Sequence, residues 1–383
     1  MSGKNLILCF DGTNNQFGPE NTNVVRLIQI LDRDSTKQRL YYDPGVGTLP
    51  EPGVRGRINS AWSKLKGLGF GAGLLSKVQE AYAYLMEYWE AGDNVYLFGF
   101  SRGAYTARVL AGLLHALGLL PRGNHNLIPY LPRYFQQLRH GHGPEDERDR
   151  TSEWKQFCEE FRWTFGRQIK PTDDQRHFIV HFLGLWDTVS SIGWVWDPKH
   201  FPYTAYNPSI GHVRHAVSID ERRAFFRQNL FRPKKGQDVI ELWFPGVHSD
   251  VGGGYEKEQG RLWWSPFMWM LEESINVGLL IAKERRDEVL ANPPTEPWAE
   301  QINNSLTWKG YIGEIWPKFH YTETLPRPNL AKHREIKPGA RVHRSALERI
   351  RDSRLAYNPR NLPNAFCETT KSLTSIPTDL PVI

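Results

Sequence analysis

Cysteine is scarce in this sequence: only Cys9, Cys158 and Cys367 occur among 383 residues, and they lie far apart. So few separated thiols cannot form a disulfide framework or a cysteine metal cluster, and they indicate a reducing compartment. The sequence also lacks the His-Glu-x-x-His pattern and comparable zinc-ligand spacings. We therefore expect neither a metal nor another cofactor.

Long apolar runs are also absent. The best candidate, residues 109–120, is interrupted by His115 and is shorter than the roughly 18 residues that span a membrane. Residues 1–5 lack the apolar core and the small-residue cleavage site of a signal peptide. These absences predict a protein that has no transmembrane segment and resides in the cytoplasm.

No dense basic block with interleaved aromatic residues occurs, so we expect no nucleic-acid partner. The 48 Lys and Arg residues only slightly exceed the 42 Asp and Glu residues, which gives a net charge of +6. This excess could favour anionic surfaces such as phospholipid headgroups, but scattered charges are more typical of a solvated surface. Hydrophobic residues make up 40% of the chain and aromatic residues 13%, which predicts a large folded core.

Apolar runs and amphipathic segments alternate along the chain. Buried parallel strands, each followed by a polar turn, are predicted at residues 6–10, 95–98, 178–185 and 239–244. Helical periodicity lies between them, at residues 74–89, 104–117 and 154–165. This alternation predicts an α/β fold with a doubly wound, mostly parallel sheet and helices on both faces. Ligands bind beyond the carboxyl ends of the strands in such sheets.

Two further regions have a distinct composition. Residues 45–73 contain eight glycines and are predicted to form a mobile loop over the site. A phosphate cradle is the weaker interpretation, because these glycines do not follow a strand and the Lys-Ser/Thr of a P-loop is missing. Proline and polar residues increase after residue 290, so we expect residues 1–290 to form a catalytic domain and residues 291–383 an irregular region wrapped on the same core.

A Gly-x-Ser-x-Gly turn joins one predicted strand to the next helix, in the run Gly99-Phe100-Ser101-Arg102-Gly103. On such a turn a serine hydroxyl points away from the sheet, and the flanking glycines remove side chains that would clash. The amino terminus of the following helix directs backbone N–H groups at a developing oxyanion. Ser101 is therefore the predicted nucleophile, and an ordinary serine in a turn is the alternative.

A serine needs an imidazole as base and a carboxylate that orients it, and in this fold they follow in the order Ser, Asp or Glu, His. Asp187 and His248 each end a predicted strand in this order. Asp197 and Asp220 are the main rivals for the acid, and His212 and His215 are interpreted as helix residues.

The oxyanion hole is predicted to use the backbone N–H of Arg102 and one more N–H from the loop after the first strand, at Gly12 or Thr13. The same loop is similar to the Asp-x-Asp-Gly-Thr loop of aspartate-nucleophile phosphatases. That reaction is excluded, because the nucleophilic position is occupied by Cys9.

Several strings together resemble a known family, the uncharacterised α/β-hydrolase-domain proteins that include type VI secretion phospholipase effectors. The matching strings are Phe10-Asp11-Gly12-Thr13-Asn14, Tyr42-Asp43-Pro44-Gly45-Val46-Gly47-Thr48, Gly99-Phe100-Ser101-Arg102-Gly103-Ala104, Gly184-Leu185-Trp186-Asp187-Thr188-Val189, Asp220-Glu221-Arg222-Arg223, Pro245-Gly246-Val247-His248-Ser249-Asp250-Val251-Gly252-Gly253-Gly254-Tyr255 and Tyr357-Asn358-Pro359-Arg360-Asn361-Leu362. The resemblance implies an α/β-hydrolase-like fold, a Ser101–Asp187–His248 triad and hydrolysis of carboxylic esters, with phospholipid as the best-known substrate class. It also leaves open export by a specialised secretion system.

Residues 262–270 are rich in tryptophan and form either a helix packed on the sheet or a patch for peripheral membrane contact. The favoured function is a serine hydrolase that cleaves carboxylic esters, an esterase of the lipase or phospholipase type. The alternative is a non-catalytic ligand-binding or scaffold protein that retains the hydrolase fold.

Overall fold

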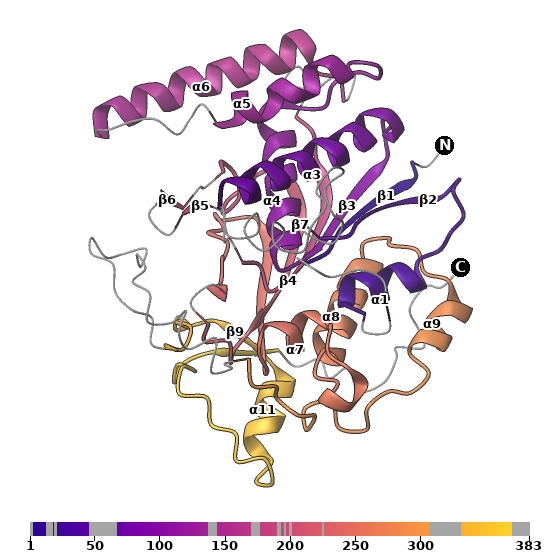
Figure 1. Ribbon diagram of the computed structural model, residues 1–383, viewed down its shortest axis with the longest axis vertical. Helices are drawn as coiled ribbons and strands as arrows, with labels where there is room; N and C mark the ends of the chain where they lie inside the picture. Colours follow the sequence, from indigo (N-terminus) through magenta and orange to yellow (C-terminus); the bar gives the residue numbers. More distant parts are fainter. Residues whose placement is uncertain are drawn as a thin grey trace, which may run out of the picture.

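The computed structural model describes residues 3–12, 18, 21–45, 67–136, 144–169, 177–189, 193–194, 197–198, 201–223, 226–305 and 331–369. Its centre is a parallel sheet (Figure 1). The strands follow in the spatial order β10 (Cys367–Thr369), β9 (Arg341–His343), β8 (Asp238–Phe244), β7 (Ile210–Ser218), β4 (Val180–Trp186), β3 (Asn94–Phe100), β1 (Asn5–Phe10) and β2 (Gln38–Asp43). Every neighbouring pair in this order is parallel, so the carboxyl ends of these strands share one edge.

Helices cover both faces of the sheet (Figure 1). One face carries α3 (Gly67–Tyr88), α4 (Arg102–Leu117), η1 (His125–Tyr130), α5 (Leu131–Gln136) and α6 (Pro144–Phe165). The other carries α1 (Asn23–Ile30), α8 (Trp264–Ile275) and α9 (Lys283–Val289). Strand β1 shows why both faces can be covered. Its residues Leu6 and Leu8 pack into the first core and Ile7 and Cys9 into the second, as a strand buried on both sides requires.

Shorter elements lie outside these two layers. An antiparallel pair joins β5 (Gly193–Trp194) to β6 (Asp197–Pro198). Two short helices, α7 (His248–Gly252) and η4 (Lys257–Gln259), follow β8, and α11 (Arg344–Arg351) follows β9.

The predicted α/β class, the parallel sheet and the helices on both faces are confirmed. The four predicted strands correspond to β1, β3, β4 and β8, and the three predicted helices to α3, α4 and α6. The remaining strands that the structure describes, among them β2 and β7 of the central sheet, are not among the predicted ones.

The interpretation of His212 and His215 as helix residues is wrong, because both lie in β7. This strand carries polar side chains that find partners on neighbouring elements. His212 Nδ1 lies 2.7 Å from Asp238 Oδ2, and His215 Nδ1 lies 2.8 Å from Glu241 Oε1 of β8. Cross-strand pairs of this kind allow polar residues in a central strand, so the apolar pattern that reveals buried strands is broken here.

Part of the predicted glycine-rich loop is helical. Residues 67–73 lie in α3, and residues 46–66 lie outside the described residues. Extending an existing helix adds one hydrogen bond for each residue, which offsets the roughly 1 kcal/mol that a glycine costs there.

The tryptophan-rich segment belongs to the core. Within α8, Trp264, Phe267 and Met270 are buried in the cluster that covers the α1 face of the sheet. Of the two interpretations of this segment, the helix packed on the sheet is therefore the one that the structure supports. Among the helices that the structure describes, none combines the length and apolar character needed to cross a bilayer.

The C-terminal part is more regular than expected. Residues 331–369 contribute β9, α11 and β10. Strand β9 pairs with β8, and β10 pairs with β9 and forms one edge of the sheet. A small core that includes Val217, Trp243, Ile336 and Val342 joins this part to the sheet. The division at residue 290 into a catalytic domain and a C-terminal region remains a prediction.

Candidate active site

Ser101 sits on the turn between β3 and α4, in a backbone conformation that side chains rarely adopt, with φ 59° and ψ −122°. The flanking glycines make this bend feasible. A Cβ on Gly99 would lie 2.6 Å from Ala104 Cα, and one on Gly103 would lie 2.2 Å from the Phe10 carbonyl oxygen. Both obstacles are backbone atoms that cannot move aside. The Gly-x-Ser-x-Gly pattern is thus a steric requirement of this strand–turn–helix junction.

Three side chains that are far apart in the sequence meet at the carboxyl edge of the sheet. Ser101 follows β3, Asp187 follows β4, and His248 begins the helix after β8. His248 Nε2 lies 2.8 Å from Ser101 Oγ, and His248 Nδ1 lies 2.6 Å from Asp187 Oδ2. All three are buried. The structure therefore brings together the three residues predicted as nucleophile, base and acid.

The charge state of Asp187 sets the tautomer of His248. Burial opposes ionisation of Asp187, but Arg334 and His248 outweigh it and hold the pKa of this carboxyl below its ordinary value. An ionised carboxylate only accepts hydrogen bonds, so Nδ1 of His248 carries the proton and Nε2 is free to accept one from Ser101. Burial lowers the pKa of His248, although Asp187 and Glu221 raise it in part. The imidazole is thus neutral at neutral pH, as a general base must be.

Aromatic rings hold the imidazole of His248 from two sides. Phe100 stacks on it with a centroid distance of 4.7 Å, and Phe226 meets it edge-on at 4.7 Å. The backbone N–H of His248 donates to Glu221 Oε2 at 3.2 Å. A Cβ on Gly252 would lie 1.9 Å from Phe100 Cε2, so the glycine at this position leaves room for the stacked ring.

The three residues predicted to supply oxyanion-hole N–H groups differ in how the structure places them. Arg102 is the first residue of α4, so its backbone N–H lies at the amino terminus of this helix, directly after the serine. The Gly12 N–H donates to its neighbour Asp11 at 2.7 Å, so that bond must open before Gly12 can bind an oxyanion. Thr13 lies outside the described residues.

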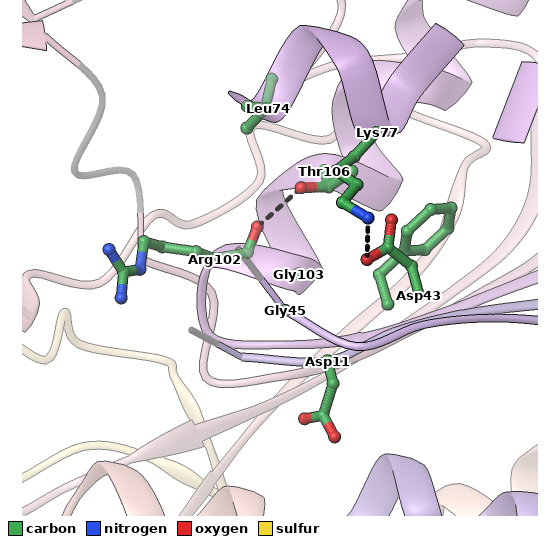
Figure 2. Close-up of a pocket in the computed structure, with 9 residues that line it drawn as sticks. Asp11, Asp43, Gly45, Leu74, Lys77, Arg102, Gly103 and Thr106 are labelled. Carbon is green, nitrogen blue, oxygen red and sulfur yellow. Dashed lines mark hydrogen bonds and ion pairs between the residues drawn. The ribbon is translucent and has the colours of Figure 1, made fainter. Parts of the chain in front are cut away.

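A small cavity lies beside the serine turn (Figure 2). Its wall includes Asp11, Asp43, Lys77 and Arg102, and Lys77 Nζ pairs with Asp43 Oδ1 at 3.2 Å. Its volume of about 10 Å³ holds roughly one water molecule, which is too little for an acyl chain. The guanidinium of Arg102 extends away from this cavity (Figure 2).

Asp220, one of the two rivals for the acid, bonds to groups other than His248. Asp220 accepts hydrogen bonds from the Gly246 N–H at 2.7 Å and the Tyr357 hydroxyl at 2.9 Å. Asp197 belongs to the small β5–β6 pair, apart from the central sheet. Within the described ranges, no three His, Cys, Asp or Glu side chains are grouped as a metal site would require.

Sequence reasoning missed the residues that surround Asp187. Arg334 binds both of its carboxylate oxygens, and Ser218 donates to Oδ1 from its backbone N–H at 2.9 Å and its hydroxyl at 3.1 Å. Ser218 ends the unpredicted strand β7, and Arg334 lies in a region expected to be irregular. Glu221, which accepts a hydrogen bond from the His248 N–H, was missed as well. Its place in one of the strings that carry the family resemblance was the signal that could have indicated it.

Comparison with known proteins identifies the family. A family model described as the T6SS phospholipase effector Tle1-like catalytic domain matches residues 4–273. The uncharacterized protein YEL023C of Saccharomyces cerevisiae is 40% identical over 238 residues, which are 61% of this chain and 33% of that protein. A crystal structure of an uncharacterized protein from Pseudomonas aeruginosa is 20% identical with a TM-score of 0.41, and covers 76% of this chain and 48% of its own. A structure of the Tle1 effector bound to the VgrG spike from the type VI secretion system is 20% identical with a TM-score of 0.36. The match covers 66% of this chain and 52% of that chain.

The chain spans about one third of the yeast relative and about half of the two solved chains. The family model, in contrast, matches well over half of this chain. The chain therefore belongs to the family of Tle1-like phospholipase effector catalytic domains of the type VI secretion system.

Proposed function

We propose that this protein is a serine esterase of the lipase or phospholipase type, in which Ser101 is the nucleophile, His248 the general base and Asp187 the residue that orients the base. The observation that carries the proposal is the continuous hydrogen-bonded chain from Ser101 Oγ through both ring nitrogens of His248 to Asp187. The strained backbone at Ser101 and the lowered pKa of His248 agree with this proposal.

The reaction follows from this chain of contacts. His248 Nε2 takes the hydroxyl proton of Ser101 while Oγ forms a bond to the carbonyl carbon of the ester. The carbonyl oxygen becomes an oxyanion that the Arg102 N–H stabilises, together with Gly12 or Thr13 after rearrangement of the Gly12–Asp11 contact. The ester C–O bond then breaks, and the imidazolium gives its proton to the departing alkoxide. In the second half of the reaction, His248 takes a proton from water while the water oxygen attacks the acyl carbon. The bond to Ser101 Oγ then breaks, His248 returns the proton to Oγ, and the carboxylic acid leaves.

A phospholipid ester is the proposed substrate class, because the family is described as phospholipase effectors. The protein would reach such a substrate by peripheral contact with a lipid surface. The test is mass spectrometry of a total-lipid extract incubated with the wild-type protein or with Ser101→Ala. We expect free fatty acid and the matching lysophospholipid to accumulate with the wild type only.

Neutral glycerides in the same extract serve as the internal control for headgroup preference. Equal product formation by the two proteins would contradict the proposed nucleophile. If the wild type hydrolysed neutral glycerides but no phospholipid, the protein would still be an esterase, and the proposed phospholipid substrate would be wrong.

The pH dependence of hydrolysis provides a separate prediction. His248 must be neutral to accept a proton, and burial lowers its pKa below the ordinary value of 6.5. Asp187 stays ionised throughout this range, because its pKa is also lowered. We therefore expect kcat/KM to be constant around neutral pH and to fall as the pH decreases, with a midpoint below 6.5.

The measurement is a pH–rate profile on a soluble ester whose own ionisation is constant over the range. Thermal unfolding at each pH separates loss of activity from loss of structure. A midpoint well above the ordinary histidine value would contradict a desolvated base.

A further inference from the structure

We propose that Arg334 is a positioning residue of the active site, and that it completes the site from a segment beyond the family match. This inference rests on the proposed function, in which Asp187 orients His248. The match with the family model covers residues 4–273, so it includes Ser101, Asp187 and His248 but not Arg334.

The contact between Arg334 and Asp187 is bidentate. One guanidinium nitrogen lies 2.5 Å from Asp187 Oδ1 and the other lies 3.0 Å from Oδ2. Both side chains are almost completely buried, with 3% and 0% of their surface exposed. Paired N–H donors in this planar arrangement fix the orientation of a carboxylate as well as its charge.

The guanidinium also ties together the surroundings of Asp187. It donates to the hydroxyl of Ser218 at 2.6 Å and to the backbone carbonyl of Phe226, the residue whose ring meets His248 edge-on. Asp187 itself adopts a φ of 41°, which a non-glycine residue holds only when its surroundings impose it. With Arg334 in place, the Asp187 carboxylate cannot rotate away from His248 without breaking several buried hydrogen bonds.

The segment that supplies Arg334 is anchored to the sheet. Asn361 Nδ2 donates to the Arg334 carbonyl at 3.1 Å and to the Ile219 carbonyl at 2.9 Å. Ile336 packs in the small core with Val217 and Val342. Asn361 lies in one of the strings that carry the family resemblance, and these contacts give it a role: it fixes the backbone from which Arg334 extends.

Arg334 also affects the protonation of the Asp187–His248 pair. Among the described residues, the charged groups that act on His248 are Asp187, Glu221 with its partner Arg223, and Arg334. Arg334 is the cation among them that binds Asp187 directly. Without it, the pair binds its next proton more readily, whichever of the two groups receives that proton. The active form, with ionised Asp187 and neutral His248, would then be lost at a higher pH.

The test compares Arg334→Gln and Arg334→Lys with Arg349→Gln in the full chain. Arg349 is a matched control, because it is equally buried but donates to the carbonyls of Trp298 and Glu300 rather than to Asp187. We expect Arg334→Gln to lower kcat about 10- to 100-fold, by analogy with the loss that follows removal of a hydrogen-bond partner of a metal ligand, and to move the acid limb of the pH profile to higher pH. Arg334→Lys should restore much of the midpoint and less of kcat, since an ammonium keeps the charge but not the bidentate geometry.

The outcomes separate this inference from the proposed function. If Arg334→Gln and Arg349→Gln lower thermal stability alike and neither moves the pH midpoint, Arg334 has only a structural role and the inference is overturned. The inference is also overturned if the wild type is active and Ser101→Ala is inactive, but the pH–rate profile of Arg334→Gln equals that of the wild type. NMR titration of the His248 ring in wild type and Arg334→Gln does not depend on turnover. There we expect an upward shift of the apparent midpoint, and its absence would refute the inference even if the protein proved to have no esterase activity.

Discussion

Replacing Ser101 with alanine should lower kcat for ester hydrolysis by at least about 10⁴-fold, because loss of the nucleophile removes the acyl-enzyme route altogether. Folding should change little. Alanine keeps the Cβ and therefore the same backbone strain at φ 59°, and within the described residues the hydroxyl makes one hydrogen bond, to His248 Nε2. The measurements are turnover of a p-nitrophenyl ester, covalent labelling by a fluorophosphonate, and the thermal unfolding midpoint.

Ser76→Ala is a suitable control, because Ser76 is an exposed serine on α3 that bonds only to Glu80 in the described chain. It should label and turn over like the wild type. Labelling of Ser101→Ala at the wild-type level would exclude Ser101 as the nucleophile. If folded wild-type protein gave neither turnover nor labelling, the non-catalytic ligand-binding or scaffold alternative would replace the esterase.

The part of the site that could be predicted from sequence is the part with a local pattern. Ser101 lies in a turn whose glycines are required sterically, and Asp187 and His248 each lie in the loop or helix that follows a predicted apolar strand. Strand order then places these ends along one edge of the sheet. Local pattern and topology together were enough to select three residues from distant parts of the chain.

Partners that act through long-range contacts carry no local pattern. Arg334 is 147 residues from Asp187 in the sequence, and its neighbourhood is polar and rich in basic residues. Strand β7 was missed for a related reason. Its polar residues are compatible with a buried strand only because Asp238, Glu241 and Glu273 on other elements pair with them. Such pairing is a property of the folded chain, so single-residue preferences do not reveal it.

Replacing Asp187 with asparagine is expected to have the largest combined effect on activity and stability. An amide can donate to His248 Nδ1 and stabilise the other tautomer, in which Nε2 carries the proton and cannot accept one from Ser101. We expect kcat to fall about 10⁴-fold, as for the equivalent change in serine proteases. The substitution also leaves the buried guanidinium of Arg334 without its counter-ion, which typically costs about 3–5 kcal/mol of unfolding free energy.

The double variant Asp187→Asn/Arg334→Gln separates these two effects. Removing both charges should recover part of the unfolding free energy lost in Asp187→Asn, because a buried neutral pair does not carry the cost of an unpaired charge. Activity should stay low, since the amide still faces His248. Chemical denaturation of the wild type, both single variants and the double variant gives the coupling energy. Additive losses of stability would show that Arg334 and Asp187 do not act as a pair, whereas recovered turnover in the double variant would mean that the charge of Asp187 is not required for catalysis.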